Sequence, residues 1–436
     1  MGETIFALAS APGRAGIAVV RLSGPMAREA VKALTGQDVP LPRQAVLRRF
    51  RDGAGGEIDR GLLIWFAAPA SFTGEDVAEF HLHGGRAIIE ALAAALAALP
   101  GCRMAEPGEF TRRAVLNGKF DLTQAEALAD LVAAQTEAQR RQALRQYEGA
   151  LSALVEGWRA ELIQALAWAE AVIDFTDEDL PQDVLKQARA TANDVRGALE
   201  AQLNDARRGE LIREGLFLTV IGPPNAGKSS LVNALAGRDV AIVSETVGTT
   251  RDVIEVHLDL GGYAVILADT AGLREASEAV EAEGVRRALA RAETADLVLL
   301  LLDGSDPNLS VKLPGNMVNK PCLTVWNKAD LPWPVRRDGL ILSLKTGEGL
   351  AALIEAIAAK AKELLDSKSA PALTRPRHRQ ALTEAAACLA RADTAQQPEL
   401  FAEDLRLAFR ALGRLTGRVD VEELLDIVFR DFCIGK

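Results

Sequence analysis

Residues 216–229 read LFLTVIGPPNAGKS, and this stretch decides the fold of the central part of the chain. The apolar run Leu216–Ile221 is followed by Gly222–Ser229, which fits the pattern G-x-x-x-x-G-K-[ST]. A strand, a glycine-rich loop and a helix in this order predict a phosphate-binding loop, whose backbone N–H groups point at phosphate oxygens. Lys228 is the expected catalytic cation beside the β- and γ-phosphates, and Ser229 the expected hydroxyl ligand of Mg²⁺. The residues predicted to bind the nucleotide here are Asn225, Ala226, Gly227, Lys228, Ser229 and Ser230.

Apolar strands alternate with helical segments over residues 214–362. The four clearest runs are LFLTVIG, YAVILAD, LVLLLLD and LTVWN. This alternation predicts an α/β domain with a mostly parallel sheet. The second run leads into Asp269, Thr270, Ala271 and Gly272, where an acid can hold Mg²⁺ through water and a glycine N–H can sense the γ-phosphate.

The fourth strand is followed by Asn327, Lys328 and Asp330, and these residues indicate which base is bound. A carboxylate at position 330 can accept hydrogen bonds from the N1–H and the exocyclic amine of guanine. Adenine offers no such pair of donors, so it would leave a buried acid unpaired. Ser343 and Lys345, in the next strand-to-helix turn, are expected to support the base pocket. GTP is therefore the predicted substrate.

The composition favours a helix-rich protein with several domains. The chain has 436 residues, of which 49% are hydrophobic but only 5% aromatic. A net charge of −10 means that any RNA contact must come from a local basic patch or from a partner subunit. The four cysteines show no C-x-x-C spacing, and the sequence has no signal peptide and no apolar run long enough for a membrane span. A cytoplasmic location without a membrane span is expected.

The first 120 residues mix short strands with turns and predict an α+β domain. Gly16–Leu22 and Gly61–Phe66 are apolar runs bounded by Gly, Ser or Pro. Ala87–Leu99 is an Ala/Leu-rich helix that Pro100 ends.

Residues 121–213 and 363–436 are expected to form a helical domain into which residues 214–362 are inserted. One apolar stripe is predicted on the first part, from Leu151, Leu154, Val155, Trp158 and Leu162. The acidic stretch 174–183 fits a solvated interhelix loop better than a metal site, because no His or Gly pattern accompanies the acids.

These motifs, taken in order, resemble those of the translation-factor-like GTPases. The sequence GTTRD at residues 248–252 adds a first switch, with Thr250 placed to reach Mg²⁺. Leu273 stands where small signalling GTPases carry the Gln that orients the attacking water, so another residue must position the water.

The rest of the chain narrows this resemblance to the MnmE (TrmE) family of tRNA modification GTPases. The similar stretches are APGRAGIAVVRLSG at 11–24, SFTGEDVAEFHLHGG at 71–85, EPGEFTRRAVLNGKFDLTQAE at 106–126, DTAGLRE at 269–275 and FCIGK at 432–436. The implied fold class is multidomain α/β and α+β: an N-terminal α+β folate-binding-like domain, a helical domain and an inserted Ras-like P-loop GTPase domain.

The resemblance also implies a reaction and its partners. The N-terminal domain would dimerise and bind 5-formyl- or methylene-tetrahydrofolate as a one-carbon source. A flavoprotein partner, MnmG, would join the homodimer in a heterotetramer or larger assembly. Together they would add a carboxymethylaminomethyl or aminomethyl group to C5 of the wobble uridine of certain tRNAs.

Site residues are implied in the same way. Folate would be held by Arg21, Glu79, Lys119 and Lys436, and K⁺ by Asn225, Ser244, Thr246 and Thr249. Ser244, Thr249 and Thr250 would also line the nucleotide site, and Thr250 and Asp269 would join Ser229 at Mg²⁺. Glu281 would orient the attacking water in place of the missing Gln. Cys433 is a candidate catalytic nucleophile, with a redox-sensitive contact to folate or an inert packed residue as the alternatives.

Two other classes of function are weighed against this one. A regulatory GTPase switch that binds ribosomes or stress-response partners would hydrolyse GTP without binding folate. An ATP-using transporter or motor is disfavoured by Asp330 and by the lack of a membrane span.

Overall fold

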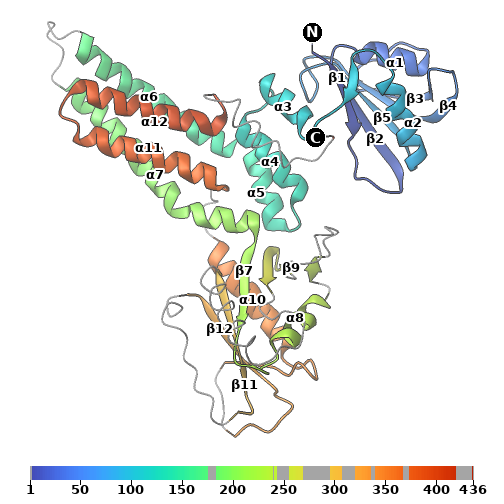
Figure 1. Cartoon of the computed structure of the whole chain (residues 1–436). Helices are drawn as coiled ribbons and strands as arrows, with labels where there is room; N and C mark the ends of the chain where they lie inside the picture. The colour runs from blue at the N-terminus through green and yellow to red at the C-terminus, as the bar shows by residue number, and fades with distance from the viewer. Residues whose placement is uncertain are drawn as a thin grey trace, which may run out of the picture. The chain divides into compact units, whose positions relative to one another are not determined.

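The structure, a computed structural model, describes residues 2–174, 183–238, 240–242, 255–268, 295–306, 320–334, 339–366, 373–418 and 435. The chain divides into two compact units. One unit contains residues 1–129, 147–192 and 391–436, and the other contains residues 130–146 and 193–390. Each unit contains its own sheet (Figure 1).

The first unit begins with a six-stranded sheet of order β3-β4-β5-β2-β1-β6. Its strands are β1 (Thr4–Leu8), β2 (Ala15–Ser23), β3 (Ala45–Arg51), β4 (Glu57–Phe66), β5 (Val77–Gly84) and β6 (Cys102–Met104). Helices α1 (Ala27–Thr35) and α2 (Arg86–Ala97) pack on it, and aromatic side chains such as Phe50, Trp65 and Phe80 fill the core between them. The two predicted strands lie in β2 and β4, and the predicted helix is α2, so these predictions are confirmed.

Helices make up most of the rest of the first unit. They include α3 (Glu109–Leu116), α4 (Leu122–Ala133), α6 (Ala150–Asp174) and α12 (Pro398–Thr416), with α6 lying alongside α12 (Figure 1). Helix α4 also extends into the second unit, and the helices α5 (Glu137–Tyr147), α7 (Val184–Glu214) and α11 (Pro376–Thr394) likewise contribute residues to both units. Among the described residues, no helix has the length and apolar character needed to cross a membrane.

The apolar stripe predicted on α6 needs one correction. Leu151, Val155, Trp158 and Leu162 are buried, as predicted, but the side chain of Leu154 is 37% exposed. The four buried residues follow one another at spacings of four, three and four, which keeps them on one line along the helix. Leu154 lies at the edge of that line and therefore faces solvent in part.

The second unit contains a seven-stranded sheet of order β13-β12-β11-β7-β10-β9-β8. Its strands are β7 (Leu216–Ile221), β8 (Ala241–Ile242), β9 (Glu255–Leu260), β10 (Tyr263–Ala268), β11 (Leu297–Asp303), β12 (Cys322–Asn327) and β13 (Leu340–Ile341). Helices α8 (Lys228–Ala236) and α10 (Leu350–Leu365) contribute to its core. Neighbouring strands are parallel from β13 to β10 and antiparallel at β9 and β8, so the prediction of a mostly parallel sheet is confirmed.

Strand β9 was not predicted, although it has a clear pattern. Its sequence EVHLDL alternates polar and apolar residues, and Val256, Leu258 and Leu260 are buried. A strand with only one buried face has no continuous apolar run, whereas such runs predict strands β7, β10, β11 and β12. The turn after β9 also contacts the start of helix α5, where Ala138 N donates to the carbonyl oxygen of Gly262 at 2.9 Å.

Candidate functional site

The candidate nucleotide site lies at one edge of the seven-stranded sheet. Strands β7, β11 and β12 run parallel, so their carboxyl ends meet at the same edge. The phosphate-binding loop follows β7, and Asn327 ends β12 in register with Asp303 at the end of β11. Ligands of parallel α/β sheets bind at this edge, where loops from several strands converge.

The phosphate-binding loop has the conformation that its sequence predicts. Gly227 has φ 102°, and a Cβ there would lie 2.5 Å from Asn327 Nδ2, so only glycine fits at this position. Asn225 also has a positive φ, 60°, and its side chain is exposed. Lys228 begins helix α8, and its Nζ donates to the carbonyl oxygens of Gly222 and Pro223 at 3.0 and 2.9 Å. Ser229 and Ser230 follow in the first turn of the helix, where N–H groups have no partner within the helix and suit an anion.

Asn327 joins the phosphate-binding loop to the base-recognition loop. Its Nδ2 donates to the carbonyl oxygen of Ala226 at 2.8 Å, and its Oδ1 accepts from Leu344 N at 3.1 Å. The side chain is 4% exposed, so both bonds are shielded from water. Two loops that are about 100 residues apart in the sequence are thereby held as one surface.

Asp330 is held by the two residues that were predicted to support the base pocket. Ser343 Oγ donates to Asp330 Oδ1 at 2.7 Å, and Lys345 Nζ lies 3.8 Å from Oδ2. The hydrogen bond from Ser343 lowers the pKa of Asp330. The side chain is therefore an ionised acceptor, which is the form that pairs with the two donors of guanine.

One contact at this site was not predicted from the sequence. Lys328 Nζ lies 2.6 Å from Asp303 Oδ2. Burial opposes ionisation of Asp303, but hydrogen bonds from Lys328 and Ser305 outweigh it and lower the pKa of this carboxyl group. The sequence signal was an acid at the end of an apolar strand, in the place that Asn327 occupies on the next strand.

In the first unit, two of the residues implied to bind folate form an ion pair. Arg21 on β2 and Glu79 on β5 are register partners, and Arg21 Nε and Nη2 both donate to Glu79 Oε1, at 3.1 and 2.9 Å. The Arg21 guanidinium lies 5.1 and 5.8 Å from the ring centroids of Phe72 and Phe110. Glu79 Oε2 lies 3.5 Å from His81 Nε2. A cation, a carboxylate and two aromatic rings therefore gather on one face of the sheet.

Lys119 and Gly435 each contact the backbone of the N-terminal domain. Lys119 Nζ donates to the carbonyl oxygen of Pro69 at 2.8 Å, in the segment that leads into Phe72. Gly435 has φ 99°, and a Cβ there would lie 2.0 Å from the carbonyl oxygen of Leu8 at the end of β1. The backbone at Gly435 therefore passes so close to β1 that a side chain cannot be accommodated.

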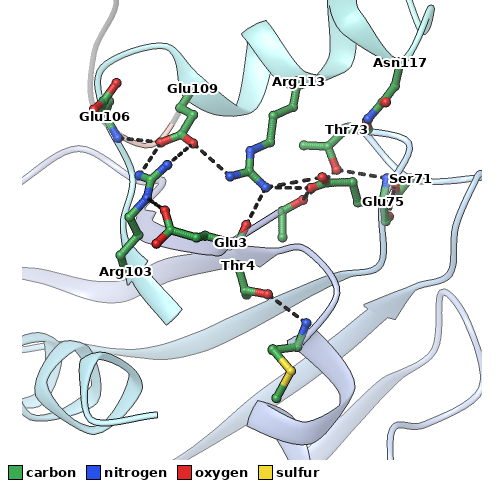
Figure 2. A network of polar contacts seen from close by, with 12 residues as sticks. Glu3, Thr4, Ser71, Thr73, Glu75, Arg103, Glu106, Glu109, Arg113 and Asn117 are labelled. Atoms are coloured by element: carbon green, nitrogen blue, oxygen red, sulfur yellow. Dashed lines mark hydrogen bonds and ion pairs between the residues drawn. The ribbon is translucent and has the colours of Figure 1, made fainter. Parts of the chain in front are cut away.

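Figure 2 shows a network of ion pairs that fixes helix α3 and the loop carrying Phe72. Glu109 accepts from Arg103 Nη2 at 2.6 Å and from Arg113 Nη2 at 2.9 Å. Arg113 Nη1 also donates to the carbonyl oxygen of Glu3 and reaches both carboxylate oxygens of Glu75, at 3.3 and 3.2 Å. Glu75 follows Phe72 by three residues, so the network also restrains the loop that places the Phe72 ring beside Arg21.

Comparison with known proteins assigns the chain to a family. Residues 4–119 match the GTP-binding protein TrmE N-terminus, and residues 122–433 match the MnmE helical domain. This chain belongs to the MnmE family of tRNA modification GTPases. The resemblance and the fold class predicted from the sequence are confirmed.

Full-length MnmE proteins agree with this assignment. The tRNA modification GTPase MnmE of Parvibaculum lavamentivorans is 58% identical over 441 residues, which cover 100% of both chains. The protein of the same name from Paramagnetospirillum magneticum is 57% identical over 443 residues, again 100% of both. The one from Rhodospirillum rubrum is 54% identical over 453 residues, 100% of this chain and 99% of the relative.

Several site residues predicted from the motifs or from the family resemblance lie outside the described residues. They are Ser244, Thr246, Thr249, Thr250, Asp269, Thr270, Ala271, Gly272, Glu281, Cys433 and Lys436, and their roles stay predictions. Most of the acidic stretch 174–183 lies outside as well. Within the part of the chain that the structure describes, no group of three or more His, Cys, Asp or Glu could hold a metal ion. Cys102, Cys322 and Cys388 are free thiols, and burial raises the pKa of Cys102 and of Cys322, which disfavours reactive thiolates.

We expect the network around Glu109 to make the N-terminal domain of this MnmE protein sensitive to acid. Burial raises the pKa of Glu109, but hydrogen bonds from Arg103, Glu106 N and Arg113 bring it from 4.5 down to about 2. At about 1.4 kcal/mol per pKa unit, this corresponds to about 3 kcal/mol of stability. Because the folded pKa is depressed, the contribution is present above pH 4.5 and is lost as the pH falls toward about 2.

We therefore expect Glu109→Gln to lower the melting temperature of the N-terminal domain at pH 7. The difference from the wild type should shrink steadily between about pH 4.5 and pH 2 in calorimetric scans. Glu90→Gln is the matched control, because Glu90 pairs with Arg86 on an exposed helix surface and should change little. A difference that stays constant over this pH range would contradict the assignment.

Proposed function

We propose that this chain is a potassium-dependent GTPase that takes part in modifying the wobble uridine of certain tRNAs. A flavoprotein partner, MnmG, would act with it, and a tetrahydrofolate derivative would supply the one-carbon unit of the 5-carboxymethylaminomethyl or aminomethyl group. Membership of the MnmE family carries the proposal, and the guanine and phosphate loops joined through Asn327 support its GTPase part.

The residues around GTP have separable tasks. Backbone N–H groups of residues 225–230 would surround the β-phosphate, and Lys228 would leave its two loop carbonyls to contact the β- and γ-phosphates. Asp330, oriented by Ser343, would accept from the N1–H and the amine of guanine. Glu281 would orient the attacking water. Hydrolysis would then reset a conformational cycle of the two GTPase domains in a homodimer.

Two metal ions belong to this proposal, and the described residues fit them in part. Ser229 stands in the first turn of α8, where a hydroxyl can reach Mg²⁺ on the phosphates, with Thr250 and Asp269 as its other expected ligands. Asn225, held exposed in the phosphate-binding loop, would give a side-chain oxygen to K⁺, together with Ser244, Thr246 and Thr249. Potassium would supply positive charge beside the phosphates where other GTPases insert an arginine.

The donor set of the N-terminal domain fits a folate. A pterin presents an amide N–H and an amine to a carboxylate, and Glu79 offers Oε2, since both bonds from Arg21 go to Oε1. Phe72 and Phe110 provide apolar surface beside this pair. Lys119 and Lys436 would contact the anionic tail. Cys433 would lie among these residues as a candidate nucleophile.

The partners follow from the same proposal. Two copies of the chain would join through their N-terminal domains and bind the flavoprotein in a heterotetramer or larger assembly. The net charge of −10 makes a basic partner surface the expected main contact for tRNA. A cytoplasmic location is proposed because the substrate is tRNA.

Replacing Asn225 by Gly tests the potassium assignment without straining the backbone. Glycine adopts the positive φ of this position freely, whereas alanine would not, so only the side-chain oxygen is lost. We expect GDP affinity to change by less than about threefold, while the excess turnover in KCl over matched NaCl falls by about tenfold or more. Arg43→Gly is the control, because it makes the same kind of change at another exposed residue of positive φ, 64°, that lies outside the GTPase sheet. Unchanged potassium stimulation in Asn225→Gly would show that the ion is held elsewhere.

A further inference from the structure

We propose that Trp333 and Asp303 are positioning residues for guanine recognition, holding Lys328 in the turn that presents Asp330. Lys328 has φ 68°, in the left-handed region that residues with a side chain rarely adopt. Such a conformation persists only where the surrounding structure imposes it. At this loop, Asp303 holds the side chain of Lys328 and Trp333 holds its backbone.

The side chain of Lys328 is fixed by the end of strand β11. Its Nζ lies 2.6 Å from Asp303 Oδ2. The other oxygen of Asp303 accepts from Ser305 N at 2.9 Å and from Ser305 Oγ at 2.6 Å, so the carboxylate itself is fixed. Gly304 N donates to the carbonyl oxygen of Asn327 at 2.9 Å, which ties the same segment to the start of the recognition loop.

The backbone of Lys328 is fixed by Trp333. The carbonyl oxygen of Lys328 accepts from Leu331 N at 3.0 Å and closes a turn in which Asp330 is the third residue. Trp333 Nε1 donates to the same oxygen, also at 3.0 Å. The indole therefore fixes the first residue of the turn that carries the carboxylate of Asp330.

The indole ring of Trp333 is itself held in place by packing. A Cβ on Gly304 would lie 2.3 Å from two ring atoms of Trp333, so the ring lies flat against the backbone of Gly304. The ring also packs against an apolar cluster that includes Leu302 and Trp326. Asp303, Gly304 and Trp333 thus pack together and hold Lys328 in place. None of the three is among the residues expected to contact the base.

Trp333→Phe tests this role, because phenylalanine keeps an aromatic ring on Gly304 but has no N–H to donate. The probes are GDP and IDP, since IDP lacks the exocyclic amine that Asp330 recognises. We expect the affinity of the full chain for GDP to fall by about tenfold and that for IDP by clearly less, measured by displacement of a fluorescent GDP analogue. The preference for GDP over IDP would therefore shrink.

Four further variants separate a positioning role from a loss of stability. Gly304→Ala, which displaces the indole, should reduce the preference as Trp333→Phe does. Asp303→Asn, which retains an acceptor for Lys328, should reduce it less than Asp303→Ala. Trp65→Phe makes the same chemical change in the core of the N-terminal sheet and should leave the preference as in the wild type. A wild-type preference in both Trp333→Phe and Gly304→Ala would overturn the proposal, and so would equal losses for GDP and IDP accompanied by a lower melting temperature.

Discussion

Asp330→Asn should move the nucleotide preference of this protein from GTP to XTP. The carboxylate of Asp330 is ionised and can accept from both the N1–H and the amine of guanine. Asparagine presents one acceptor and one donor, and its donor would face the guanine amine. Xanthine carries a carbonyl oxygen in place of that amine, so the asparagine donor would find a partner there.

We expect a large effect of Asp330→Asn on affinity, because the carboxylate of Asp330 can accept from both the N1–H and the amine of guanine. Loss of both hydrogen bonds to the base costs about a thousandfold or more in affinity. We expect affinity for GTP to fall by about that factor and affinity for XTP to rise, in competition binding on the full chain. Glu348→Gln, an exposed acid in the neighbouring loop, should leave GTP affinity unchanged. Continued preference of Asp330→Asn for GTP over XTP would show that another residue recognises the base.

Lys228→Ala should almost abolish GTP turnover. The ammonium group lies at the start of α8 and donates to two carbonyl groups of its own loop, from which it can move to phosphate oxygens. Positive charge at this position stabilises the charge that moves onto the phosphates in the transition state. We expect kcat to fall by about a hundredfold to a thousandfold in a phosphate-release assay.

The control for this variant is Lys360→Ala, which removes a lysine paired with Glu363 on helix α10 of the same domain. Its turnover should stay within about twofold of the wild type. Lys228→Ala with more than a tenth of the wild-type kcat would contradict the role assigned to this residue.

The positions of the nucleotide motifs could be predicted from the sequence because each follows an apolar strand. Parallel strands bring their carboxyl ends to one edge, so Lys228, Asn327 and Asp330 had to converge once the four strands were recognised. The bond between Asn327 and Ala226 could not be predicted, because it depends on the side-chain rotamer at the end of β12. The ion pair between Lys328 and Asp303 was missed for a similar reason, since an acid after an apolar strand is common in loops.

The strand and helix pattern of the N-terminal domain could be predicted from the residues, but its candidate folate residues could be predicted only through the family resemblance. Arg21 and Glu79 are 58 residues apart, and nothing in their spacing shows that they are register partners on β2 and β5. The network of Glu109, Arg113 and Glu75 was not predicted either, because it joins a helix, a loop and a strand that meet only in the folded domain. Leu154 shows the limit of periodicity, which places a residue near an apolar stripe without deciding whether it is buried.

Mass analysis of the wobble nucleoside in tRNA shows whether this chain takes part in uridine modification. Undermodified tRNA would be incubated with this chain, the flavoprotein MnmG, GTP, methylene-tetrahydrofolate and an amine donor, in KCl and in matched NaCl. The donor is glycine for the carboxymethylaminomethyl group and ammonium for the aminomethyl group. We expect a 5-carboxymethylaminomethyl- or aminomethyl-uridine product in KCl that is lost when the chain, GTP or the folate is left out. GTP turnover in KCl with no change in the nucleoside would contradict this expectation and leave a regulatory GTPase switch.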